Sequence, residues 1–115
     1  MTGEEFLYKV REIKEIHSIT WDVKGDSWDA ESVGVKVVAD NEEFTVSLGS
    51  PALSSTAENL LSGTWCERVA ALLLVNKTLE LLGRPERFDI GCGLNISNAI
   101  GFAMKCTQEL HKTSD

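Results

Sequence analysis

The chain has 115 residues, of which 43% are hydrophobic and 25% are charged, and this length and composition are ordinary for one globular domain. The net charge is −7, a sign that repels phosphate backbones, so we expect no direct binding of nucleic acid. No apolar run approaches the ~20 residues of a membrane helix, and Glu4 and Glu5 stand where a secretory signal carries basic residues. We therefore expect one cytoplasmic domain over residues 1–115, without membrane contact.

The first predicted element is a helix that begins near Gly3. Thr2 and Glu5 have the spacing of a capping box, in which side chains satisfy the free N–H groups of the first turn. An apolar stripe follows at spacings of four, three and four, and it comprises Phe6, Val10, Ile13 and His17. Because this spacing places all four on one face of a helix, it predicts a helix that extends to about His17.

Three segments then alternate between apolar and polar residues, which is typical of half-buried β-strands. The apolar positions are Ile19, Trp21 and Val23 in the first segment, Val33, Val35 and Val37 in the second, and Phe44, Val46 and Leu48 in the third. Residues 25–32 look like a loop and residues 40–42 like a tight turn. Such short connections favour an antiparallel meander with one solvated face. Val38 is the one apolar residue predicted on that solvated face.

A long and very apolar helix is predicted in the second half of the chain. Thr64 and Glu67 have capping-box spacing, and the helix continues through Leu82. Gly83 followed by Pro85 is a strong stop signal, because glycine accepts the left-handed conformation that ends many helices. Apolar residues occur on several sides of this segment, so we expect it to be the central and most buried helix.

Two further helices are predicted, one on each side of the long one. Ser55 and Glu58 have the spacing to cap a short helical turn before it. The last helix runs from about residue 97 to residue 111, with Asn95 or Ser97 as its N-cap. Its predicted buried stripe comprises Ile96, Ala99, Ile100, Ala103, Thr107 and Leu110.

The order of elements favours the α+β class, because the strands are clustered in one part of the chain and most helices in another. Phe88, Ile90 and Cys92 alternate as a short fourth strand. We therefore predict two layers: a three- to four-stranded, mainly antiparallel β-meander, packed on one face by an N-terminal helix and two C-terminal helices.

The sharpest local motif lies at residues 87–95, which read Arg-Phe-Asp-Ile-Gly-Cys-Gly-Leu-Asn. After a helix and Gly-Arg-Pro, this segment resembles the first motif of S-adenosylmethionine-dependent methyltransferases, in which glycines let the cofactor approach the backbone at a strand-to-helix turn. Only 22 residues follow Gly93, so no later strand is left to carry the ribose-binding acid of that family. We expect a tight turn here, and we keep a small-molecule or nucleotide-binding protein or minor enzyme using Gly91, Cys92, Gly93 and Asn95 as the alternative.

The sequence offers no coherent catalytic or metal-binding set. The cysteines, Cys66, Cys92 and Cys106, lack the paired spacing of zinc sites, and we expect them to pack as small hydrophobes in a reducing compartment. A catalytic Cys92 would need a base, but His17 and His111 both fall at predicted helix ends. We therefore predict no catalytic residue, no metal and no cofactor, and we favour a protein that is not an enzyme.

Negative charge is concentrated in the first half of the chain. Residues 1–63 hold twelve acids and five bases, whereas residues 64–115 hold six of each. Seven of these acids lie between residues 22 and 43, around Trp28. An aromatic residue with charged neighbours is a composition that binding hot spots use, although Trp28 folding back over the core is the simpler alternative. The predicted partner-binding residues are Trp28, Asp26, Asp29, Glu31, Asp40, Glu42 and Glu43.

The leading hypothesis from these observations is a non-enzymatic, acidic interaction module that binds a basic protein surface. Inhibitors, toxin-neutralising immunity proteins, phage or mobile-element antagonists and small secretion chaperones share this size and charge, which is an analogy by general properties. A homo-oligomer is a further possibility, because part of the very apolar long helix can serve as an interface.

Overall fold

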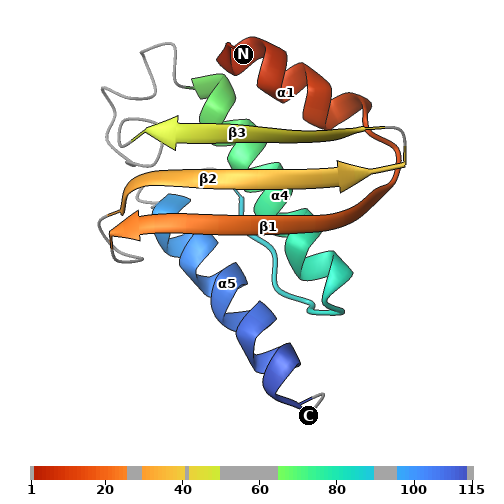
Figure 1. The fold of residues 1–115 in the computed structure, drawn as a ribbon, viewed down its shortest axis with the longest axis vertical. Helices are drawn as coiled ribbons and strands as arrows, with labels where there is room; N and C mark the ends of the chain where they lie inside the picture. The colour runs from red at the N-terminus through yellow and green to blue at the C-terminus, as the bar shows by residue number, and fades with distance from the viewer. Residues whose placement is uncertain (1, 26–29, 41, 50–64, 90–95, 114–115) are drawn as a thin grey trace.

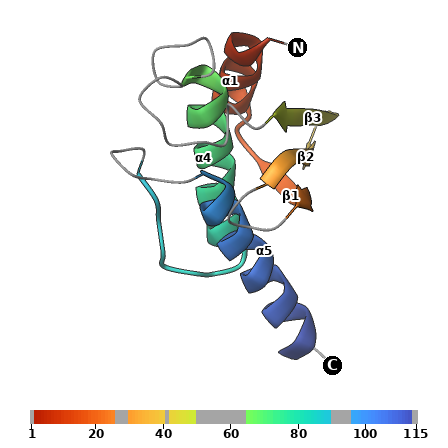
Figure 2. The same ribbon diagram turned by 90° about the vertical axis from the view of Figure 1, so that its left-hand side faces the viewer.

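The structure is a computed structural model that describes residues 2–25, 30–40, 42–49, 65–89 and 96–113. Its elements are α1 (Gly3–Glu12), β1 (Ile16–Gly25), β2 (Ala30–Ala39), β3 (Glu43–Gly49), α4 (Trp65–Leu81) and α5 (Ile96–Thr113). The strands form one layer and the helices lie together on one side of it (Figures 1 and 2). The predicted α+β class and two-layer arrangement are therefore confirmed.

The sheet is the predicted antiparallel meander, in the order β1-β2-β3. Trp21 on β1 and Val46 on β3 both lie opposite Val35 on β2, so the apolar positions of the three strands share one face. The apolar side chains of central β2, namely Val33, Val35 and Val37, are completely buried. Val38 lies on the other face and is half-buried.

The predicted fourth strand is not formed by the part of it that the structure describes. Phe88 and Asp89 lie in an irregular connector, and Ile90 and Cys92 lie outside the described residues. The connector is instead fastened to α4 by the side chain of Asn76. Nδ2 of Asn76 donates to the carbonyl of Phe88 at 2.8 Å, and the N–H of Phe88 donates to Oδ1 of Asn76 at 2.8 Å. Three strands therefore make up the sheet within the described ranges.

Helix α1 begins as predicted and ends earlier. Oγ1 of Thr2 accepts a hydrogen bond from the N–H of Glu5 at 3.1 Å, which confirms the N-cap. The helix ends at Glu12, and Ile13 already has an extended backbone with ψ of 121°. His17 belongs to β1, so its predicted place on the helix is wrong. Ile13 and His17 are four residues apart, as on one face of a helix, but they lie on either side of the short connection between α1 and β1.

Helix α4 is the central helix, as predicted, and it contacts α1, α5 and β1. It ends where Gly83 takes a φ of +74°. Two hydrogen bonds satisfy the last carbonyls: the N–H of Arg84 donates to Leu79 O at 2.9 Å, and that of Gly83 donates to Glu80 O at 3.0 Å. Both bonds belong to the Schellman motif that glycine favours at a helix end.

One buried hydrogen-bond chain joins α4 to the sheet. Nε1 of Trp21 donates to Oγ1 of Thr78 at 3.1 Å, and this hydroxyl donates to Leu74 O at 2.7 Å. Trp21 is only 7% exposed, which confirms its predicted place in the core. The indole N–H and the Thr78 hydroxyl therefore lose their contact with water without remaining unpaired.

Helix α5 begins at Ile96, so Ser97 lies inside the helix and its predicted role as N-cap is wrong. Asn95 lies outside the described residues, as does the predicted short turn at Ser55 and Glu58. The buried face of α5 comprises Ile96, Ala99, Ile100, Ala103 and Cys106, in agreement with the first four predicted positions. No helix in the described part of the chain is long and apolar enough to span a membrane.

Candidate functional site

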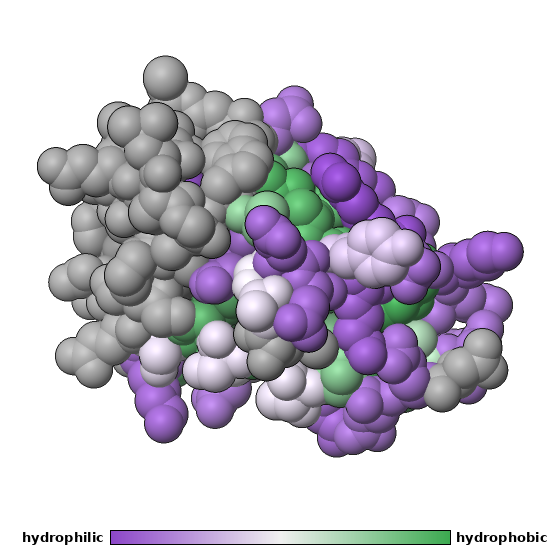
Figure 3. All heavy atoms as spheres, turned by 90° about the horizontal axis from the view of Figure 1, so that it is seen from above, coloured by the Kyte–Doolittle hydropathy of each residue, from purple (hydrophilic) through white to green (hydrophobic). Residues whose placement is uncertain are grey.

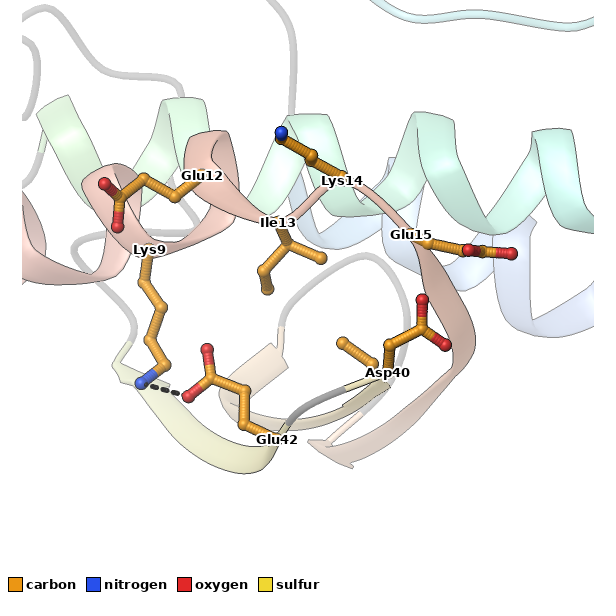
Figure 4. A pocket seen from close by; sticks show the side chains of 8 residues that line it. Lys9, Glu12, Ile13, Lys14, Glu15, Asp40 and Glu42 are labelled. Atoms are coloured by element: carbon orange, nitrogen blue, oxygen red, sulfur yellow. Dashed lines mark ion pairs between the residues drawn. The ribbon is translucent and has the colours of Figure 1, made fainter.

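A recess of about 430 Å³ lies where the end of α1 meets the turn between β2 and β3 (Figure 4). It is lined by Lys9, Glu12, Ile13, Lys14, Glu15, Ala39, Asp40 and Glu42. The volume falls within the range of small-molecule sites, about 300–1,000 Å³, but such sites are mostly apolar. Four acids and two lysines line this recess. Its chemistry therefore suits a charged group of a partner better than an apolar ligand.

Two of the acids that the sequence placed in the partner site, Asp40 and Glu42, line this recess, and Glu43 follows them at the start of β3. Each of the three has a basic side chain of the same chain as its partner. Oε2 of Glu42 lies 2.8 Å from Nζ of Lys9, as Figure 4 shows. Oε1 of Glu43 lies 3.0 Å from Nζ of Lys36. The remaining pair joins Oδ1 of Asp40 to Nε2 of His17. Lys9 therefore links the turn between β2 and β3 to α1, His17 links it to β1, and Lys36 joins β2 to β3.

Asp40 is a carboxylate whose pKa its neighbours change. The hydrogen bond from His17 lowers the pKa of the Asp40 carboxyl below its ordinary value, and Glu15 contributes further in the same direction. In Figure 4 the Asp40 carboxylate points up towards the Glu15 side of the recess. Asp40 is therefore held in its anionic form at this rim, which favours a cationic contact.

The outer face of α1 extends the acidic surface beyond the recess. Glu4, Glu5 and Glu12 are exposed on this helix, together with one exposed base, Arg11. Tyr8 lies among them and is 66% exposed, the highest value among the exposed large hydrophobic residues that the structure describes. Seen from above, this side of the molecule is mainly hydrophilic, with small hydrophobic areas between the polar side chains (Figure 3). We call Glu4, Glu5, Tyr8 and Glu12, together with the recess, the α1 face.

The other predicted site residues are not brought into this site by the structure. Trp28, Asp26 and Asp29 lie outside the described residues, and Glu31 is part of β2 without a described side chain. The alternative small-molecule site of Gly91, Cys92, Gly93 and Asn95 also lies outside the described residues. Their predicted roles therefore stay predictions.

A second, smaller recess of about 200 Å³ lies between β1 and the ends of the last two helices. It is lined by His17, Ser18, Ile19, Thr78, Leu81, Leu82 and Thr107. Leu81 is 44% exposed there. His17 thus stands between the two recesses, with its ring paired to Asp40.

The two cysteines that the structure describes lie in different settings. Cys106 is buried in the core and Cys66 is half-buried, and both are free thiols. The burial of Cys106 agrees with the expectation that such thiols pack as small hydrophobes, whereas Cys66 is only half-buried and Cys92 lies outside the described residues. No group of three or more His, Cys, Asp or Glu side chains in the described part is placed to hold a metal ion.

Sequence reasoning missed the residues that α1 contributes to this surface. Lys9, Lys14 and Glu15 line the recess only because α1 ends next to the turn between β2 and β3, and no local pattern reports that meeting. Tyr8 did carry a signal, because it lies off the stripe of Phe6 and Val10 and so had to face outward.

Comparison with protein-family models, with curated proteins and with solved structures found no match to this chain.

Proposed function

We propose that the chain is a non-enzymatic, acidic interaction module that binds a basic protein partner through the α1 face. The observation that carries this proposal is an exposed aromatic residue, Tyr8, within a surface of exposed carboxylates. Aromatic residues are enriched at interfaces, and complementary charge steers and orients the encounter of two proteins. An inhibitor, an immunity protein or a chaperone-like protein is the kind of module that this surface suits.

The internal ion pairs do not prevent such binding. The side chains of Lys9 and Glu42 are 31% and 42% exposed, and those of Lys36 and Glu43 are more than half exposed. Exposed ion pairs of this kind contribute only about 0–1 kcal/mol to stability. A lysine or arginine of a partner therefore displaces Lys9 or Lys36 at little cost, and the released carboxylate gains a less solvated contact in the interface.

The test uses two variants with the same change in net charge. Glu12→Lys combined with Glu15→Lys reverses charge on the α1 face, whereas Asp89→Lys combined with Glu109→Lys reverses it in the electrically balanced half. The immobilised wild-type protein and both variants are exposed to the same native lysate at low and high ionic strength. We expect a retained basic protein that high salt releases, and whose affinity falls at least about tenfold only in the α1-face variant.

Two outcomes contradict the proposal. One is that no protein is retained by the wild type even at low ionic strength. The other is that the two variants lose affinity equally, since the contact would then follow net charge and not the α1 face. A Tyr8→Ala variant gives a readout that is independent of charge, because we expect it to weaken the same complex without changing its salt dependence.

A further inference from the structure

Arg68 is the one charged side chain buried in the core of the described part, with an exposed fraction of 1%. It lies in the first turn of α4. Its Nε and Nη1 atoms have no hydrogen-bond partner there, and none of the ion pairs within the described ranges involves it. Arg84 provides a contrast, because its Nη2 lies 2.8 Å from Oε2 of Glu86.

A guanidinium in this position cannot escape its charge. Burial lowers the pKa of Arg68, but arginine stays protonated in proteins. A buried cation without a counter-ion costs several kcal/mol, which is comparable with the whole stability of a domain, about 5–15 kcal/mol. A nearby anion would offset much of this cost.

The neighbouring acid does not fill this role. Glu67 precedes Arg68 directly, and side chains at adjacent positions of a helix do not face each other. The Glu67 side chain instead lies against the start of α1, where a Cβ added to Gly3 would come within 2.8 Å of its Cγ. Glu67 is thus directed towards α1.

The helix ends around Arg68 also favour an anion. Helices α1 and α4 begin at the same end of the molecule, behind the end of β3 (Figures 1 and 2), as the contact between Gly3 and Glu67 requires. The N-terminus of a helix carries a partial positive charge and free N–H groups that bind anions. The Thr2 side chain caps α1. The positive end of the α4 dipole repels the Arg68 cation in the first turn of that helix. An anion at this place would therefore reduce both this repulsion and the cost of burying the unpaired cation.

We infer that the start of α4 is a binding site for a small oxyanion, such as a phosphoryl or carboxylate group, with Arg68 as its charged ligand and the N–H groups of the first turn of α4 as additional donors. This site lies beside the start of α1, whereas the recess of the acidic α1 face lies at the other end of that helix. The protein accordingly has one surface for a basic partner and one buried site for an anionic ligand, and the two act on opposite charges.

The experiment measures thermal unfolding of the full chain while inorganic phosphate, and separately acetate, replaces chloride at constant ionic strength. We expect the wild-type midpoint to rise by several degrees with millimolar phosphate, because a ligand that binds only the folded state stabilises it. Arg68→Met removes the charge and keeps much of the apolar stem, and we expect it to weaken the phosphate affinity at least about tenfold. Arg84→Met is the matched control, and its phosphate response is expected to equal that of the wild type.

Three results would overturn the inference. The first is that neither phosphate nor acetate changes the unfolding midpoint of the wild type. The second is that phosphate raises the midpoint of Arg68→Met as much as that of the wild type, since phosphate also stabilises proteins non-specifically. The third is that Arg68→Met loses much stability while the wild-type midpoint does not respond to either anion. That result would assign the counter-ion to a carboxylate of this chain. If Arg68→Met does not fold, the phosphorus NMR line of phosphate is measured with the wild type and with Arg84→Met. The inference then requires that both proteins broaden this line equally and that added sulfate reverses the broadening.

Discussion

The two ends of the molecule place charge in opposite settings. Around the turn between β2 and β3, carboxylates and cations meet in water, and each member of a pair is at least 31% exposed. At the start of α4, a single cation is 1% exposed and has no hydrogen-bond partner among the described residues. The first arrangement stabilises little and is easily exchanged, whereas the second is costly until an anion arrives. Burial, and not the number of charges, therefore separates the proposed docking surface from the proposed anion site.

Thr78→Val is expected to have the largest effect on stability among the polar contacts described. Valine has a similar shape but leaves the buried Nε1–H of Trp21 without its acceptor, which costs about 1–3 kcal/mol. Urea unfolding followed by circular dichroism measures the loss. The control is Trp21→Phe in the Thr78→Val background, because phenylalanine removes the unpaired donor. The double variant is expected to lose less stability than the sum of the losses of the two single variants. A fully additive result would show that the bond contributes nothing.

Asn76→Ala is expected to have a smaller and more local effect. It removes both hydrogen bonds that hold Phe88 to α4, and each bond contributes about 1 kcal/mol at a half-buried site. Because Phe88 also packs on Phe102 with ring centroids 5.8 Å apart, the connector keeps one contact. Hydrogen exchange of residues 84–89 should accelerate more than that of α4. Equal acceleration throughout the protein would contradict this local role.

Asp40→Asn is expected to have the smallest effect, and one that depends on pH. The pKa of Asp40 is lowered in the folded protein, so its contribution is fully present above the ordinary carboxyl pKa of about 4 and is lost as the pH falls through the folded value. The variant should therefore lose a little stability near neutral pH and converge with the wild type in acid. Thermal unfolding at several pH values measures this difference. A gap that stays the same at pH values below the ordinary carboxyl pKa would show that the Asp40 carboxylate makes no such contribution.

Local signals in the sequence predicted the limits of several elements correctly. The Thr2 and Glu5 spacing identified the start of α1, and Gly83 identified the end of α4, because caps depend on a few adjacent residues. Alternation identified the three strands and their buried faces. The end of α1 was missed because His17 fits the spacing of a helix and also lies in β1. The start of α5 was predicted to within one residue, at about residue 97 against Ile96 in the structure.

The candidate sites were less accessible to sequence reasoning. The pairing of Lys36 with Glu43 depends on strand register, since Lys36 lies opposite Thr45 and diagonal to Glu43. The pairing of Lys9 with Glu42 depends on where α1 packs, which no local pattern reports. Arg68 was hidden by the usual rule that charged residues face solvent. Each of these contacts joins elements that only the folded chain brings together.

The contact between Gly3 and Glu67 also bears on how the chain folds. All three strands pair with their neighbours in sequence, so the meander closes only short loops. Helix α1 meets α4 only after the entire sheet and its following segment have been laid between them, and closing such a long loop is slow. We therefore expect the hairpins to form early and the seating of α1 beside α4 to come last, with the proposed surface for a basic partner completed only in that final step.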